Sequence, residues 1–279
     1  MGRLFDRKEV TSPNFYRAVV GEFFAMLLFV FIGIGSTTGW PNAPTSPSMV
    51  QIALAFGIAI ATMVQCFGHI SGGHVNPAVT IALLLTGKVT ILRAVLYIIA
   101  QLVGAIAGAG LVYAVTPEAV RGGLGVTGLS TGMSAGMGVG VELLLTFQLV
   151  LTIFATVDGN RTDLNGSASL SIGLSVVIGH LFGVKYTGAS MNPARSFGPV
   201  VIMNAWDNHW VYWVGPIAGA ILAAWLYEFL LDPTASTARL RRCVTCASAE
   251  DQPIHDAELT DIRKLDNEDA KILSCDNNI

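Results

Sequence analysis

The sequence predicts an all-α membrane protein with six transmembrane helices and two re-entrant half-helices, built as an inverted repeat of three plus three spans. Three observations predict this fold. The composition is strongly apolar, six segments are long enough to cross a bilayer, and the tripeptide Asn-Pro-Ala occurs in corresponding places of the two halves of the chain.

The composition argues against a soluble enzyme or a nucleic-acid-binding protein. Of the 279 residues, 52% are hydrophobic and 13% are charged, whereas a soluble domain carries about 25% charged residues. The mean hydropathy is +0.59, and a net charge of −3 gives no sign of nucleic-acid binding. The sequence contains no nucleophile–base set, metal-ligand cluster or phosphate-binding loop. We therefore expect no catalytic activity, no cofactor and no metal.

Six apolar segments each approach or exceed the roughly 20 residues that a membrane helix needs. They are residues 15–39, 49–67, 89–115, 137–157, 168–184 and 210–231. The chain accordingly divides into an N-terminal segment (1–14), a membrane domain (15–232, with repeats of about 15–118 and 134–232) and a C-terminal tail (233–279).

Lysine and arginine predict the orientation, because short cytoplasmic connections carry an excess of these residues. Cations precede the first span, follow the sixth, and occur in the second and fourth connections. The first connection (39–48) has none, and the third (115–136) has only Arg121. Both termini are therefore expected in the cytoplasm, and we expect the plasma membrane as the location.

The internal repeat carries most of the functional information. The tripeptide at 76–78 recurs 116 residues later at 192–194, and Glu22 in the first span has a counterpart in Glu142 of the fourth at nearly the same offset. Because each repeat has an odd number of spans, the second lies upside down in the membrane. Inverted repeats of this kind form their pore or binding site at the repeat interface, near the midplane.

Each Asn-Pro-Ala opens an apolar segment, about 76–86 and 192–203, that is too short to cross the bilayer. Asparagine is a preferred N-cap and proline fits the first helical position, so each segment is predicted to be a half-helix. Inversion brings the two N-termini together in the middle of the membrane. The motif residues are Asn76, Pro77, Ala78, Asn192, Pro193 and Ala194. The preceding loop residues, whose backbone is expected to line the path, are Gly72, Gly73, His74, Gly188 and Ser190.

Two longer stretches carry a resemblance to a known family. Gly-His-Ile-Ser-Gly-Gly-His-Val-Asn-Pro-Ala-Val-Thr (68–80) and Tyr-Thr-Gly-Ala-Ser-Met-Asn-Pro-Ala-Arg-Ser-Phe-Gly-Pro (186–199) resemble the signature loops of the aquaporins. The resemblance covers about residues 15–232, and residues 61–74 are most similar to the glial, brain-type members. It implies a passive water channel driven by osmotic gradients, assembled in the lipid bilayer as a homotetramer with one pore per subunit.

The resemblance also implies a constriction. In the family four residues form the narrowest point, and matching them one by one gives Phe56, His180, Ala189 and Arg195. Glycerol-conducting relatives usually carry a small residue in place of this histidine and an aspartate after the arginine, whereas Ser196 stands there here. The pattern therefore resembles that of channels that exclude ions, protons and glycerol. Mercury-sensitive members have a cysteine where Ala189 stands, so we expect weak inhibition by mercury through this position.

Several alternatives stay open. We interpret Glu22 and Glu142 as acceptors that support the re-entrant loops, although carboxylates inside a membrane can also relay protons. A secondary transporter also uses inverted repeats and broken helices, but it would need ion-coupling carboxylates in the pore. A low-conductance junctional or structural membrane protein of the same fold is the other alternative.

The C-terminal tail is polar, with a basic cluster followed by an acidic stretch. Cys243 and Cys246 follow the basic cluster close to the membrane, where cysteines are candidates for palmitoylation; unmodified thiols are the alternative. Two cysteines alone are too few for a zinc site. Apolar residues at helical spacing within 259–265 raise the hypothesis of a cytoplasmic partner for the tail.

Overall fold

The computed structural model describes residues 9–40, 47–161, 163 and 166–232, and all regular structure in this part of the chain is helical. Within it, six helical stretches are long and apolar enough to cross a membrane: Pro13–Gly35, Met49–Ser71, Ile91–Val115, Ala135–Thr156, Ala168–Thr187 and Val211–Leu231. The predicted all-α fold with six spans is confirmed. The candidate palmitoylation sites Cys243 and Cys246, with the rest of the tail, lie outside the described residues.

The elements follow one another in the order expected for two repeats. The first repeat contains η1 (Glu9–Thr11), α1 (Pro13–Gly35), α2 (Met49–Ser71), α3 (Pro77–Leu85) and α4 (Ile91–Val115). A short helix, α5 (Glu118–Arg121), lies in the connection. The second repeat contains α6 (Ala135–Thr156), α7 (Ala168–Thr187), α8 (Pro193–Met203), α9 (Val211–Leu226) and the π-helical turn η2 (Tyr227–Leu231).

Side-chain caps begin four of the spans. Ser48, Thr90, Ser134 and Ser167 each accept a hydrogen bond from the backbone N–H three residues later. Such a cap satisfies one of the donors that a helix start leaves without a partner. The caps explain why α4 and α6 begin within a few residues of the predicted starts at 89 and 137.

Three predicted helix ends need correction, and the smallest change is in α7, which runs three residues past the predicted residue 184 to Thr187. Helix α1 ends at Gly35, short of the predicted residue 39, and the hydroxyls of Ser36, Thr37 and Thr38 donate to carbonyl oxygens of its last turn. Helix α2 continues past the predicted residue 67 to Ser71, where Gly72 turns the chain with a φ of 90°. Only glycine adopts this left-handed conformation without strain.

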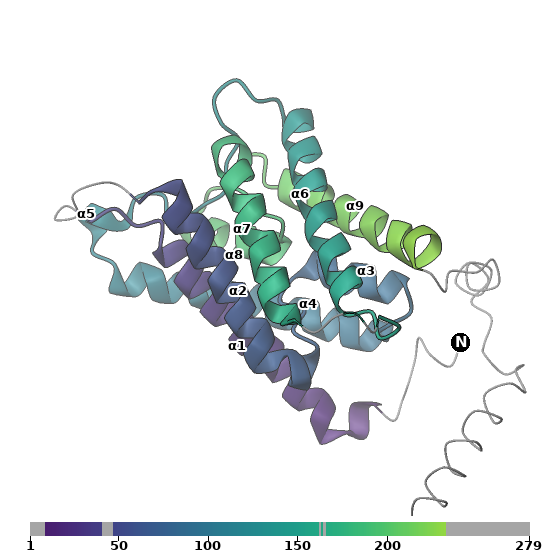
Figure 1. Ribbon diagram of the computed structural model, residues 1–279. Coiled ribbons are helices and arrows are strands. Elements are labelled where there is room, and N and C mark those ends of the chain that lie inside the picture. Colours follow the sequence, from purple (N-terminus) through teal and green to yellow (C-terminus); the bar gives the residue numbers. More distant parts are fainter. Residues whose placement is uncertain (1–8, 41–46, 162, 164–165, 233–279) are drawn as a thin grey trace, which may run out of the picture.

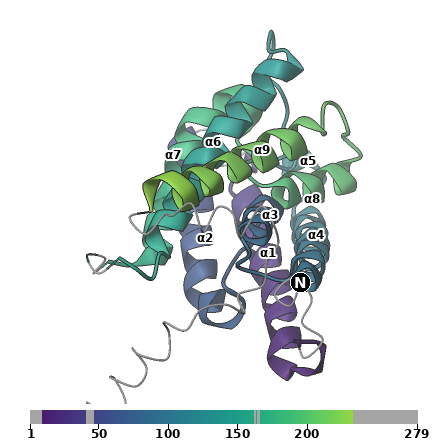
Figure 2. The same ribbon diagram turned by 90° about the vertical axis from the view of Figure 1, so that its right-hand side faces the viewer.

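The packing of the helices reproduces the repeat (Figures 1 and 2). Helix α1 packs against α4 in the first half as α6 packs against α9 in the second, and α2 and α7 join the halves. The short helices cross over: α3 packs against α9 as well as α4, and α8 packs against α4 as well as α9. Each half-helix is therefore held by spans of both repeats.

Glycines allow the close crossings. A Cβ on Gly57 would lie 2.6 Å from the carbonyl oxygen of Gly173, and a Cβ on Gly173 would lie 2.5 Å from that of Gly57. Gly104 and Gly219, which also correspond in the repeats, face the carbonyls of Phe23 and Leu143 in the same way. Small residues at helix contacts are typical of membrane bundles, because they let backbones approach.

Candidate pore and selectivity site

The two Asn-Pro-Ala motifs meet through reciprocal hydrogen bonds. Asn76 Nδ2 donates to the carbonyl oxygen of Met191 at 2.8 Å, and Asn192 Nδ2 donates to that of Val75 at 2.7 Å. Each Oδ1 caps its own half-helix by accepting from Ala78 N at 2.9 Å or from Ala194 N at 3.1 Å. An amide nitrogen carries two hydrogens, so each asparagine keeps one for a further acceptor.

The helices that start at these asparagines point their N-termini at each other. Pro77 and Pro193 occupy the first helical positions. An N–H at that position would have no acceptor within the helix, so proline costs no hydrogen bond there. Helix N-termini carry partial positive charge. The junction therefore joins two positive helix ends at the centre of the bundle.

The loops before the motifs have an unusual backbone. Gly72, Gly73 and Gly188 have positive φ, which glycine accepts readily. Three further residues with side chains also have positive φ, and they are Val75 (47°), Ala189 (53°) and Met191 (53°). Val75 and Met191 correspond in the two repeats. Such conformations cost free energy and persist only where the surroundings hold them.

Two buried carboxylates hold these loops. Glu22 accepts from the backbone N–H of His74 at 2.9 Å and of Val75 at 2.7 Å. Glu142 accepts from the N–H of Ser190 at 2.9 Å and of Met191 at 2.8 Å. Both side chains are 0% exposed. The two acids therefore bond to the backbone at the strained positions.

Sequence reasoning missed a second set of loop contacts. Tyr97 donates to the carbonyl oxygen of Ser71 at 2.9 Å, and Tyr212 makes the matching bond to Thr187 at 2.9 Å. Gln101 donates to Glu22 Oε2 at 2.8 Å. The two tyrosines lie 115 residues apart, so a systematic comparison of the repeats could have found them.

The side chains of Phe56, His180 and Arg195 come together from α2, α7 and α8. The rings of Phe56 and His180 are stacked with centroids 4.4 Å apart, and Arg195 Cζ lies 4.6 Å from the Phe56 centroid. Arg195 donates to the carbonyl oxygen of Gly125 at 2.7 Å, which fixes one arm of its guanidinium. The fourth predicted residue, Ala189, lies beside α7. A Cβ added to Gly183 of that helix would lie 3.1 Å from the Cβ of Ala189.

Two polar atoms at this cluster have no hydrogen-bond partner among the described residues. His180 Nδ1 bonds to the carbonyl oxygen of Val176 at 3.0 Å, but its Nε2 is buried without a hydrogen bond, and so is Arg195 Nε. Buried polar atoms almost always find a partner. Together with the remaining amide hydrogens of Asn76 and Asn192, these atoms are suited to bind small polar molecules one after another along a path.

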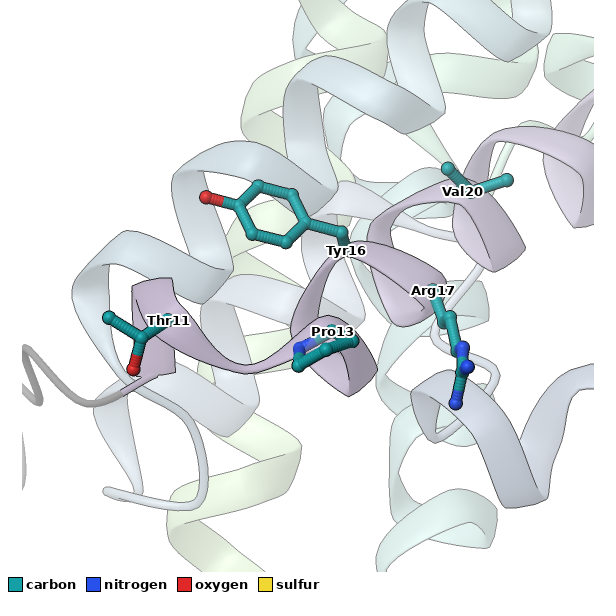
Figure 3. Close-up of a pocket in the computed structure, with 5 residues that line it drawn as sticks. All are labelled: Thr11, Pro13, Tyr16, Arg17 and Val20. Carbon is teal, nitrogen blue, oxygen red and sulfur yellow. The ribbon is translucent and has the colours of Figure 1, made fainter.

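A separate groove lies on the outside of the bundle (Figure 3). Its lining is Thr11, Pro13, Tyr16, Arg17 and Val20, around the first turns of α1. Tyr16 and Val20 are exposed, whereas the loop-supporting Glu22 is on the buried face of the same helix. The groove is therefore not part of the junction between the half-helices.

Comparison with known proteins decides the family. The profile of the major intrinsic protein family matches residues 9–227. The chain belongs to this family. It is 58% identical over 228 residues to aquaporin-4 of Homo sapiens and to that of Bos taurus, covering 81% of this chain and 71% of each relative. It is 56% identical over 228 residues to aquaporin-5 of Homo sapiens, covering 81% of this chain and 85% of that protein.

A solved structure agrees with the fold. The aquaglyceroporin from Plasmodium falciparum superposes with a TM-score of 0.72 at 25% sequence identity, covering 78% of this chain and 98% of that one. The resemblance to the brain-type aquaporins is thus confirmed, and the protein is an integral membrane water channel. The family is one of channels.

Proposed function

We propose that this aquaporin passes water and excludes ions, protons and glycerol, and that the constriction of Phe56, His180 and Arg195 carries this selectivity. The contact of these three side chains, with ring centroids 4.4 Å apart and the guanidinium carbon 4.6 Å from the Phe56 ring, supports the proposal most directly. Water crosses in single file past His180 and Arg195, and then past the asparagines of the two motifs.

Desolvation favours water over ions at such a point. An ion that enters a dry constriction loses its hydration shell, at an idealised cost on the order of tens of kcal/mol. A water molecule exchanges hydrogen bonds that are each worth about 1 kcal/mol net, and His180 Nε2, Arg195 Nε and the asparagine amides offer replacements.

Protons are excluded by charge and by orientation. The two positive helix ends and Arg195 raise an electrostatic barrier to cations, of the kind already described for aquaporin pores in general. The remaining hydrogens of Asn76 and Asn192 donate to the oxygen of one central water molecule. Its own hydrogens then point away from the centre, which interrupts a hydrogen-bonded wire.

Glycerol is excluded by size and polarity. The bulky rings of Phe56 and His180 close one side of the constriction, and Arg195 closes another.

Ala189 contributes a small side chain and no thiol, so mercury has no cysteine to bind at this position.

Glu22 and Glu142 act as loop supports rather than as proton relays. The carboxylate oxygens of each already accept several hydrogen bonds, from the backbone and from Ser71 or Thr187. A relay group needs an acceptor that is open to the proton path, and these oxygens face the loop backbone instead.

The family and the charge pattern support the proposed assembly and orientation. The channel works as a homotetramer in the plasma membrane, with one pore per subunit and both termini in the cytoplasm. Cations in the second and fourth connections, such as Lys88 and Arg161, support this orientation.

Stopped-flow light scattering on proteoliposomes tests the proposal, with an osmotic step in sucrose and then in glycerol. Fast shrinkage with a low activation energy, and glycerol entry no faster than in empty liposomes, are the expected results. Shrinkage no faster than in empty liposomes would favour the junctional role, and fast glycerol entry would contradict the assigned constriction.

A further inference from the structure

An ion pair joins the start of the described chain to the third span. Arg93, in the first turn of α4, donates from Nε to Glu9 Oε1 at 2.5 Å, and its NH2 lies 2.5 Å from the same oxygen. The hydroxyl of Thr90, the N-cap of α4, donates to Glu9 Oε2 at 2.6 Å. Both oxygens of the Glu9 carboxylate are thereby engaged, and η1 is fixed against the start of α4.

The same guanidinium reaches a second partner. Arg93 NH1 donates to the hydroxyl oxygen of Tyr97 at 3.0 Å, one turn further along α4. Its Cζ lies 5.2 Å from the ring centroid of Phe15 and 5.6 Å from that of Tyr97. The planar fork of arginine presents five donors in a fixed geometry and here bonds to a carboxylate and a hydroxyl on different sides, whereas the ammonium of lysine is a compact point charge on a flexible stem.

Tyr97 carries the contact to the first re-entrant loop. Its hydroxyl donates to the carbonyl oxygen of Ser71 at 2.9 Å, and its ring meets that of His74 edge to face at 5.0 Å. The Ser71 hydroxyl in turn donates to Glu22 at 2.6 Å and accepts from Gly73 N at 3.1 Å. Hydrogen bonds thus connect Glu9 through Arg93 and Tyr97 to Ser71, the last residue of α2, and the Ser71 hydroxyl bonds to Glu22 and to the loop that precedes Asn76.

The second repeat has no equivalent of this connection at the matching position. Tyr212 repeats the bond of Tyr97 to the loop, but the residue 115 positions after Arg93 is Asn208, which is neutral. The arginine relay therefore belongs to the first loop alone, and it is not a general requirement of the repeated scaffold.

We propose that Arg93 is a positioning residue for water conduction, which transmits the position of Glu9 through Tyr97 to the first re-entrant loop. The inference rests on the proposed path past Asn76. Hydrogen bonds in a chain polarise one another, so the bond from Tyr97 to the loop strengthens when Arg93 donates to the same hydroxyl. Releasing Glu9 frees the guanidinium to turn away, and the loop loses part of its restraint.

Full-length variants in proteoliposomes test this relay by water permeability per channel and its activation energy. Glu9→Gln, Arg93→Lys and Tyr97→Phe should each lower the permeability by roughly two- to thirty-fold, the range for mutations within a coupled network. Arg93→Lys is informative because it keeps the positive charge but removes the rigid fork that spans Glu9 and Tyr97. The matched control is Arg17→Gln, since Arg17 is exposed near the same end of α1 and, among the described residues, its side chain bonds to Asn14 of the same turn; it should keep the wild-type value.

A double variant separates a relay from independent structural effects. If the residues act in series, Glu9→Gln combined with Tyr97→Phe should lower permeability no further than Tyr97→Phe alone. Multiplied losses, or wild-type permeability in both Glu9→Gln and Arg93→Lys, would overturn the inference. Melting temperatures identify any variant that folds poorly. If Arg93→Lys or Tyr97→Phe is unstable, the permeability of Glu9→Gln, which lies outside the spans, tests the relay without them. A wild-type channel no faster than empty liposomes would overturn the proposed function as well, whereas a fast wild type with unaffected variants overturns only the relay.

Discussion

Replacing Glu142 by glutamine removes a charge from the support of the second re-entrant loop while keeping the shape of the side chain. The carboxylate accepts from Thr187 Oγ1 at 2.6 Å, from Ser190 N at 2.9 Å and from Met191 N at 2.8 Å. A glutamine has one oxygen and one NH₂ group, so at least one of these donors then faces another donor.

The expected cost follows from these contacts. Losing a hydrogen bond to a charged acceptor costs about 1.5–3 kcal/mol, and leaving a buried N–H without a partner adds about 1–3 kcal/mol. Since about 1.4 kcal/mol corresponds to a factor of ten, the population of the loop conformation should fall more than about ten-fold. The positive φ of Met191 makes the relaxation easier, because that conformation is strained without the bond.

Stopped-flow permeability, normalised to the amount of reconstituted protein, measures this effect. Glu142→Gln should lower water permeability by about ten-fold or more and lower the melting temperature. The exposed acid Glu118 provides the control, and Glu118→Gln should behave as the wild type. Wild-type permeability and stability in Glu142→Gln would refute the reasoning, and a changed proton flux at unchanged water flux would favour the proton-relay interpretation.

Three further predictions concern the constriction and the repeat interface. Ala189→Cys should make water permeability sensitive to mercury, with recovery after a reducing agent; insensitivity would mean that this side chain does not face the path. His180→Ala should admit glycerol in the swelling assay while water permeability is retained, and continued exclusion would shift the size limit to other residues. Gly57→Leu should prevent the close approach of α2 to Gly173, lower the yield of folded protein and destabilise it by about 1–3 kcal/mol or more. A normal melting temperature would contradict the close crossing of α2 and α7.

Much of the architecture could be predicted because its causes are local. The start of each half-helix depends on one asparagine and the proline after it, and both asparagines cap their helices through Oδ1. Apolar length alone indicated the spans. Their ends were less predictable, since α1 stops where three hydroxyl residues bond back to its last turn.

The contacts that hold the loops could not be predicted from one sequence. Tyr97 bonds to a backbone carbonyl oxygen 26 residues away, and Arg195 bonds to that of Gly125, 70 residues away. A carbonyl group belongs to every residue, so no residue type marks it as an acceptor. The positive φ of Val75 is similarly hidden, because a β-branched residue normally avoids it. The bonds of its N–H to Glu22 and of its carbonyl oxygen to Asn192, both distant in the sequence, hold it there.

Simultaneous measurement of water and proton flux tests the selective pore most directly. Proteoliposomes loaded with a pH-sensitive dye would receive an osmotic step and, separately, a pH step across the membrane. The two positive helix ends, Arg195 and the paired asparagines predict rapid water movement with proton entry no faster than in empty liposomes. Proton entry that rises with the amount of reconstituted protein would contradict this account.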